Sequence, residues 1–120
     1  MADALNYRIY KAKHTTWYNA QPVAGTPTSA DRTAYKENLT FDVDVSHPMA
    51  LNQFSTANYH LSYQPYGPWQ HWLVARGYSA SGSRTYVNDP GWPAGNNASV
   101  PSWGGQGAIL DAVGAHGYVW

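Results

Sequence analysis

Alternating apolar and polar residues are clearest in the second half of the chain. The segment HWLVARGY, from His71 to Tyr78, is typical of a β-strand, and the turn SASGS joins it to a second predicted strand from Arg84 to Asn88. The short apolar run MALNQF, which follows Pro48, predicts another strand. These patterns predict a small antiparallel sheet centred on a β-hairpin with a five-residue loop.

Helical spacing occurs upstream of that sheet. Thr28 and Asp31 form the pattern of a helix N-cap with an acidic partner three residues later. Apolar residues then recur at helical intervals: Ala34, Tyr35, Leu39 and Val43. We therefore predict one main helix from about Ser29 into the low forties. A short helix over 106–113 and a final extended segment over 118–120 complete the regular elements.

Three other segments give different signals. Residues 1–13 alternate Tyr7 and Ile9 with Arg8 and Tyr10, which favours a short strand over a helix. Residues 15–27 are interrupted by Pro and Gly and indicate a connector. The segment 89–107 is rich in Gly, Pro and Asn, so we expect it to lack regular structure. Together the elements predict a single α+β domain over 1–120: a small antiparallel sheet with one main helix.

Composition excludes several classes of function. Seven Lys and Arg balance seven Asp and Glu, and charged residues make up only 12% of the chain, so no basic face for nucleic acid is expected. No run approaches the roughly 18 apolar residues of a membrane span, and the first residues lack the pattern of a signal peptide. The sequence contains no Cys, which excludes a thiol nucleophile or zinc thiolate from its own residues.

The strongest candidate chemistry lies at the ends of the predicted hairpin strands. His71 begins the first strand and Asp89 follows the second, and antiparallel pairing brings the start of one strand beside the end of the other. A carboxylate in that position would orient the imidazole for general acid–base catalysis. The alternative is a surface histidine and an aspartate that caps a turn. A hydroxyl nucleophile from the turn, Ser79, Ser81 or Ser83, would be too distant. These serines lie at the far end of the strands, roughly 20 Å from His71 and Asp89 at about 3.3 Å per residue.

Two further kinds of site remain open. An aromatic-rich loop could form a platform for glycan or peptide ligands, or could instead supply core and rim residues: Tyr59, Tyr63, Tyr66 and Trp69. Trp72 alternates with His71, so the two side chains should point to opposite faces. The five histidines lack the spacing of a metal-binding motif, and a metal-dependent site from His60, His71 and Asp89 is a weaker alternative. We expect no cofactor.

The string HWLVARGYSASGSRTYVNDP, from His71 to Pro90, resembles the core of C39-like cysteine peptidases in the papain-like superfamily. Flanking features agree in order: ADALN near the start, Val43-Asp44-Val45, Tyr59-His60 and the closing Gly117-Tyr118-Val119-Trp120. The resemblance implies the sheet half of a papain-like fold, with His71 as general base and Asp89 as its orienting partner. Asn88 is a less favoured substitute for Asp89. Secreted members of the family are the most similar, which implies a secreted protein.

The sequence also departs from that family. In C39-like peptidases the nucleophilic Cys lies on a helix near the N-terminus of the domain, with an oxyanion-stabilising Gln shortly upstream, and neither has a counterpart here. We therefore expect a truncated peptidase domain that is inactive towards peptides on its own. An N-terminal fragment bearing the Cys would complete it. The apolar surface left by such a truncation predicts a homo-oligomer.

Overall fold

The computed structural model describes residues 1–13, 17–56, 60–61, 64, 68–90 and 100–120. Within these ranges the helices are α1 (Ala2–Lys13), α2 (Ser29–Asp44) and α3 (Gln106–Val113). The strands are β1 (Ala20–Gln21), β2 (Met49–Ser55), β3 (Trp69–Ser79), β4 (Arg84–Asp89), β5 (Val100–Gly105) and β6 (Tyr118–Val119). None of the helices so described is long and apolar enough to cross a membrane.

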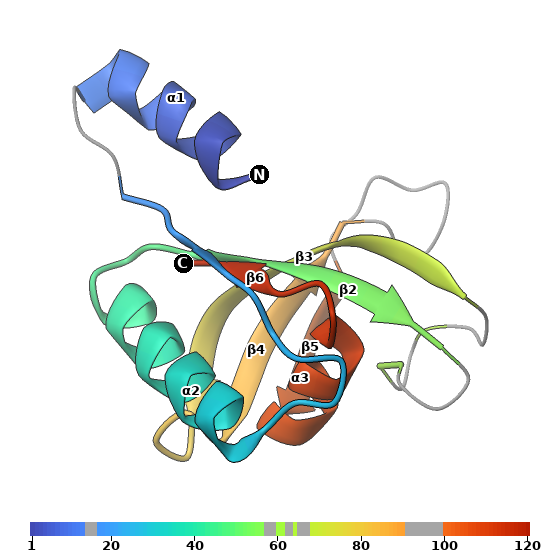
Figure 1. Cartoon of the computed structure of the whole chain (residues 1–120). Helices are drawn as coiled ribbons and strands as arrows, with labels where there is room; N and C mark the ends of the chain where they lie inside the picture. The colour runs from blue at the N-terminus through green and yellow to red at the C-terminus, as the bar shows by residue number, and fades with distance from the viewer. Residues whose placement is uncertain (14–16, 57–59, 62–63, 65–67, 91–99) are drawn as a thin grey trace.

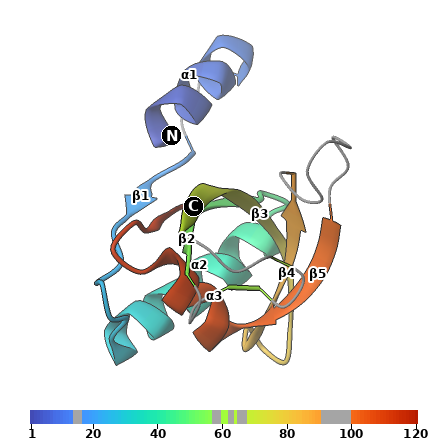
Figure 2. The same ribbon diagram turned by 90° about the vertical axis from the view of Figure 1, so that its right-hand side faces the viewer.

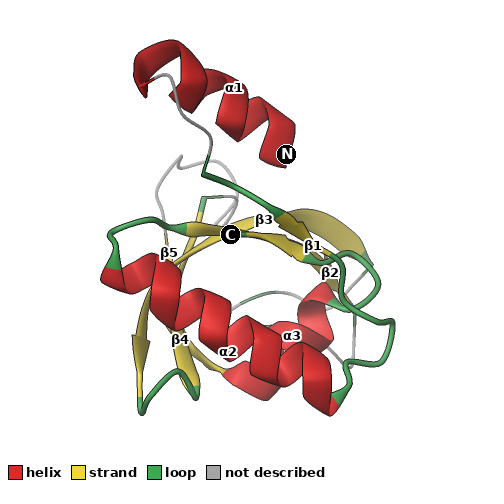
Figure 3. Ribbon diagram, turned by 60° about the vertical axis from the view of Figure 1, so that its left-hand side comes forward, coloured by secondary structure: helices red, strands yellow, loops and turns green. Residues whose placement is uncertain are grey.

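The described strands form one antiparallel sheet in the order β1-β6-β2-β3-β4-β5. The sheet curves around α2 and α3, which lie on its concave face, and α1 stands apart from the body (Figure 1). A second view shows the same division, with α2 and α3 on one side of the sheet and α1 on the other (Figure 3). The predicted α+β class is confirmed.

The central hairpin forms as the alternation predicts. β3 pairs with β4 through residues such as Val74 opposite Asn88, with a bulge between Ala75 and Gly77. The turn is one residue shorter than expected, because β3 extends to Ser79. Three successive turn residues have positive φ angles, and the third is Gly82 at 85°, the residue type that adopts this conformation most readily.

The predicted main helix is confirmed as α2, and so are its start signals. The Thr28 hydroxyl accepts a hydrogen bond from the Asp31 backbone N–H at 3.2 Å, and the Asp31 carboxylate accepts one from the Thr28 backbone N–H at 2.8 Å. This reciprocal capping box satisfies N–H groups that the first helical turn cannot pair internally. The helix buries Tyr35 and Leu39 completely against the sheet.

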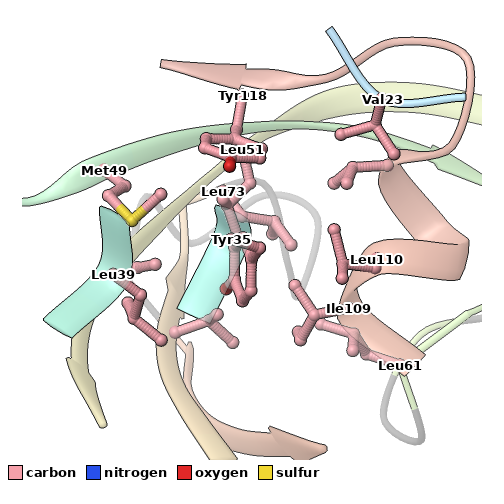
Figure 4. Close-up of a cluster of buried hydrophobic side chains, with 13 residues drawn as sticks. Val23, Tyr35, Leu39, Met49, Leu51, Leu61, Leu73, Ile109, Leu110 and Tyr118 are labelled. Atoms are coloured by element: carbon pink, nitrogen blue, oxygen red, sulfur yellow. The ribbon is translucent and has the colours of Figure 1, made fainter. Parts of the chain in front are cut away.

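The core lies between the concave face of the sheet and the two helices. Most of its buried apolar side chains come from α2, α3 and the central strands, and Leu61 comes from between β2 and β3. Figure 4 shows Tyr35, Leu39, Met49, Leu51, Leu61, Leu73, Ile109 and Leu110 in this cluster. The Tyr35 hydroxyl forms a 2.9 Å hydrogen bond with Thr85, which satisfies both buried groups. Burial raises the pKa of the Tyr35 hydroxyl far above its ordinary value, so this group stays neutral.

The N-terminal segment differs from its prediction, because residues 2–13 form α1 and not a strand. Ala2, Ala4 and Leu5 are strong helix formers, and Asp3 favours the first helical turn. A strand must also pair with another strand. The strand that pairs with β6 at this edge of the sheet is β1, which begins only at Ala20. The Asn6 side chain contacts the backbone of residues 17 and 18 through three hydrogen bonds.

The segment 89–107 also differs from its prediction where it is described. Residues 100–105 form β5, which pairs with the whole of β4. Figure 2 shows β5 at the margin of the sheet. Pro101 is accepted there because an edge strand needs backbone donors on one side only. The connector 15–27 likewise contains a two-residue strand, β1, whereas α3 and the final extended segment form as predicted.

Candidate functional site

The inward face of the sheet changes from apolar to polar at one end. In β2 the inward residues are Met49, Leu51 and then Gln53, and all three are fully buried. Gln53 lies opposite His71 in β3. In β4 the inward residues end with Asp89, so the three central strands place Gln53, His71 and Asp89 on the same face.

His71 and Asp89 meet at this polar end. The His71 Nε2 atom lies 3.3 Å from Asp89 Oδ1, which confirms the juxtaposition predicted from the strand ends. At 3.3 Å the contact is slightly longer than the usual N–H···O hydrogen bond. The Asp89 side chain is fully buried, whereas 22% of the His71 side chain is exposed. The imidazole therefore lies between a buried carboxylate and solvent.

A glutamine holds the other oxygen of that carboxylate. Gln64 Nε2 donates a hydrogen bond to Asp89 Oδ2 at 2.9 Å, and Gln64 itself is only 5% exposed. The same amide exchanges two hydrogen bonds with the Gln53 side chain, at 2.7 and 2.9 Å. Its oxygen also accepts from the Leu61 backbone N–H at 2.9 Å. The buried Asp89 carboxylate thus accepts a hydrogen bond from an amide that is itself held by Gln53 and Leu61.

Asn88 and the serines of the hairpin turn lie away from His71. Asn88 lies opposite Val74 and alternates with Asp89 along β4, so its side chain occupies the other face of the sheet from His71. The structure thus gives Asn88 no orienting role at His71. Ser79, Ser81 and Ser83 lie around the β3–β4 turn, at the end of the hairpin away from His71 and Asp89.

Most of the predicted aromatic platform lies outside the described residues. This applies to Tyr59, Tyr63 and Tyr66, while Trp69 begins β3 with a side chain that is not described. Trp72 lies opposite Asn52 and lines a hollow on the convex side of the sheet together with His116. This confirms that Trp72 and His71 face opposite ways, and the platform stays a prediction.

The described residues do not assemble a metal site. No group of three or more His, Asp or Glu side chains among them could hold an ion, and this includes His60, His71 and Asp89. Two other histidines contact aromatic rings instead. The ring centroids of His47 and Trp17 are 4.2 Å apart, and those of His116 and Phe54 are 5.3 Å apart. The metal alternative therefore gains no support.

Gln53 and Gln64 are the site residues that the sequence analysis missed. A signal for Gln53 exists, since it occupies the inward position of the alternation Met49, Leu51, Gln53, where an apolar residue is the rule. Gln64 gives no comparable signal, because the sequence around it is rich in Tyr and Pro and has no helix or strand pattern. Its position depends on contacts with Gln53 and Asp89, which are distant in sequence.

The chain matches no protein-family model, no curated protein and no solved structure.

Proposed function

We propose that this chain supplies the histidine and aspartate of a C39-like cysteine peptidase site, acting on peptides with a nucleophile from outside its 120 residues. The observation that carries the proposal is the 3.3 Å contact between His71 Nε2 and the fully buried Asp89 carboxylate. The partial exposure of the imidazole supports it as well, because a reacting group must reach the ring.

The roles of the two residues follow from their chemistry. With Nε2 directed at Asp89, the other ring nitrogen, Nδ1, is the atom that acts on the nucleophile. It takes the proton of a thiol, and the thiolate attacks the peptide carbonyl. The imidazolium then gives that proton to the leaving amine, and a water molecule, deprotonated by the same ring, hydrolyses the thioester and regenerates the thiol. The buried Asp89 carboxylate stabilises the imidazolium and fixes its orientation.

The thiol has to come from elsewhere because the sequence contains no Cys. The serines of the β3–β4 turn do not supply a nucleophile either, because they lie at the other end of the hairpin from His71 and Asp89. The chain alone should therefore not form an acyl-enzyme. A segment that carries the Gln and Cys helix of the family would supply both the nucleophile and the oxyanion donor.

Complementation tests this proposal. The chain is mixed with a synthetic peptide that spans the Gln- and Cys-bearing helix of a C39-like peptidase, and hydrolysis of a fluorogenic peptide library is followed. We expect hydrolysis only in the mixture, with a loss of about 100-fold or more in His71→Ala. Asp89→Ala should reduce the rate as well, whereas Ser81→Ala, in the distant turn, should not.

Two results would count against the proposal. Hydrolysis by the chain alone, abolished in His71→Ala, would show that the nucleophile is a residue of this chain. Equal hydrolysis by the wild-type and His71→Ala mixtures would show that the imidazole takes no part. Binding of the peptide to the chain is measured first, and only peptides that bind are used in the hydrolysis experiment.

A further inference from the structure

The hydrogen bonds of the Gln64 amide are all satisfied in a fixed arrangement. Its Oε1 accepts from Gln53 Nε2 and from the Leu61 backbone N–H, and its Nε2 donates to Gln53 Oε1 and Asp89 Oδ2. A primary amide has two donor hydrogens and two acceptor lone pairs, so these four bonds use its full capacity. Rotation of the amide would break several buried hydrogen bonds at once, which is costly.

The anchors of Gln64 are themselves rigid. Gln53 is fully buried in β2, and Leu61 belongs to the hydrophobic core. The backbone N–H of Gln64 also donates to the Leu61 carbonyl at 2.8 Å, so the backbone and the side chain of Gln64 both hold to the same residue. The amide therefore presents its donor to Asp89 from a fixed position.

The geometry at Asp89 then follows. Its two carboxylate oxygens have different partners, since Oδ2 accepts from Gln64 and Oδ1 faces His71 Nε2. A carboxylate held at one oxygen cannot turn about its terminal torsion without losing that bond, and this torsion is otherwise broad. A donor at a buried carboxylate also stabilises its negative charge, which is the form that can pair with an imidazolium.

We propose that Gln64 is a positioning residue, which fixes the Asp89 carboxylate so that one oxygen points at His71. The catalytic meaning of this role rests on the function proposed above, but the positioning itself is a property of the chain alone. Gln53 acts one step further away, by holding Gln64.

Nuclear magnetic resonance of the 15N-labelled chain tests the role without any partner. At about pH 8, where histidine is ordinarily neutral, long-range 1H–15N spectra report which ring nitrogen of His71 is protonated and how fast that proton exchanges with water. We expect the wild type to hold the proton on Nε2. Gln64→Met, which has a similar shape and no donor, should raise the exchange rate by about tenfold or more and populate the second tautomer.

Two variants separate positioning from a general loss of stability. Val87→Ala, on the same face of β4, removes core contacts but leaves the amide network intact, and it should keep wild-type exchange. Gln53→Met leaves the bond from Gln64 to Asp89 but removes one anchor, so its exchange rate should be intermediate. If Gln64→Met does not fold, the comparison of Gln53→Met with Val87→Ala decides.

The outcomes distinguish this inference from the function that it refines. A protected Nε2 proton in the wild type that is equally protected in Gln64→Met, or in Gln53→Met where that variant decides, would overturn the role of Gln64 and leave the proposed function intact. A wild-type ring that exchanges as freely as an exposed histidine would instead show that the His71–Asp89 contact does not hold in solution. That result would contradict the proposed function and the positioning role together.

Discussion

Burial places the Asp42 carboxylate in surroundings that disfavour its charge. The residue is 4% exposed near the end of α2, and its Oδ2 atom is buried with no hydrogen-bond partner among the described residues. Desolvation raises the pKa of Asp42 to about 6, although the nearby His47 acts in the opposite direction. The charge of Asp42 in turn contributes to a raised pKa of the Tyr18 hydroxyl, behind the larger effect of burial.

Stability should therefore fall as the pH rises through about 6. The pKa of Asp42 is higher in the folded chain than the ordinary 3.8, so the folded state binds this proton more tightly than the unfolded state. Asp42→Asn removes the ionisation, and we expect it to raise the free energy of unfolding by about 1–2 kcal/mol at about pH 8. At about pH 4 the two proteins should differ little. Urea denaturation at both pH values measures the effect.

The exposed Asp3 in the first turn of α1 provides the control. Asp3→Asn changes the same chemical group without the burial, so it should not reproduce the gain at high pH. Equal changes in the two variants would contradict the account, because they would point to net charge and not to desolvation at Asp42.

At the scale of single elements, the sequence predicts those elements whose hydrogen bonds join residues close together in the chain. The capping box of Thr28 and Asp31 predicts the start of α2 because its hydrogen bonds connect residues three apart. The β3–β4 hairpin is similar, since a short turn fixes its pairing. The sequence does not predict β5, because its composition, which includes Pro101, is not that of a strand. Residues 100–105 form a strand because they pair with β4. The helix α1 was missed because a short alternation outweighed its helix-forming residues.

Loss of the capping box should destabilise α2 by a modest and specific amount. Thr28→Ala removes the hydroxyl that accepts from the Asp31 N–H, and we expect the free energy of unfolding to fall by about 1 kcal/mol. Ser29→Ala changes a neighbouring exposed hydroxyl, and it should have a much smaller effect. Thermal or urea denaturation of the two variants tests this, and equal losses would show that the cap is not the cause.

The residues of the candidate site also differ in how far the sequence predicts their positions. His71 and Asp89 could be predicted because they stand at the ends of two strands joined by a short turn, so that the hairpin register alone brings them together. Gln64 could not, because its position depends on contacts with the Leu61 backbone and with Gln53, which is 11 residues away in the sequence. Alternation along β4 also predicts that Asp89, and not Asn88, lies on the face of His71.

At the scale of the whole molecule, the sheet brings the pieces of the site together. β2, β3 and β4 contribute Gln53, His71 and Asp89 at the same end of the concave face. The rest of that face is covered by the hydrophobic core, to which Leu61 belongs, and the Leu61 backbone N–H donates a hydrogen bond to Gln64. Several large apolar side chains remain exposed in the described chain, among them Trp17, Phe41 and Phe54. They are compatible with self-association, and the homo-oligomer stays a prediction.

The reactivity of a supplied thiol tests the central claim most directly. The Cys-bearing peptide is bound to the chain, and alkylation of its thiol by iodoacetamide is followed at about pH 6, where an ordinary cysteine is almost entirely protonated. If His71 and Asp89 form a working half-site, the thiol should react about tenfold or more faster on the wild-type chain than on His71→Ala. Equal alkylation rates on the two chains, with binding of the peptide verified for both, would contradict the account.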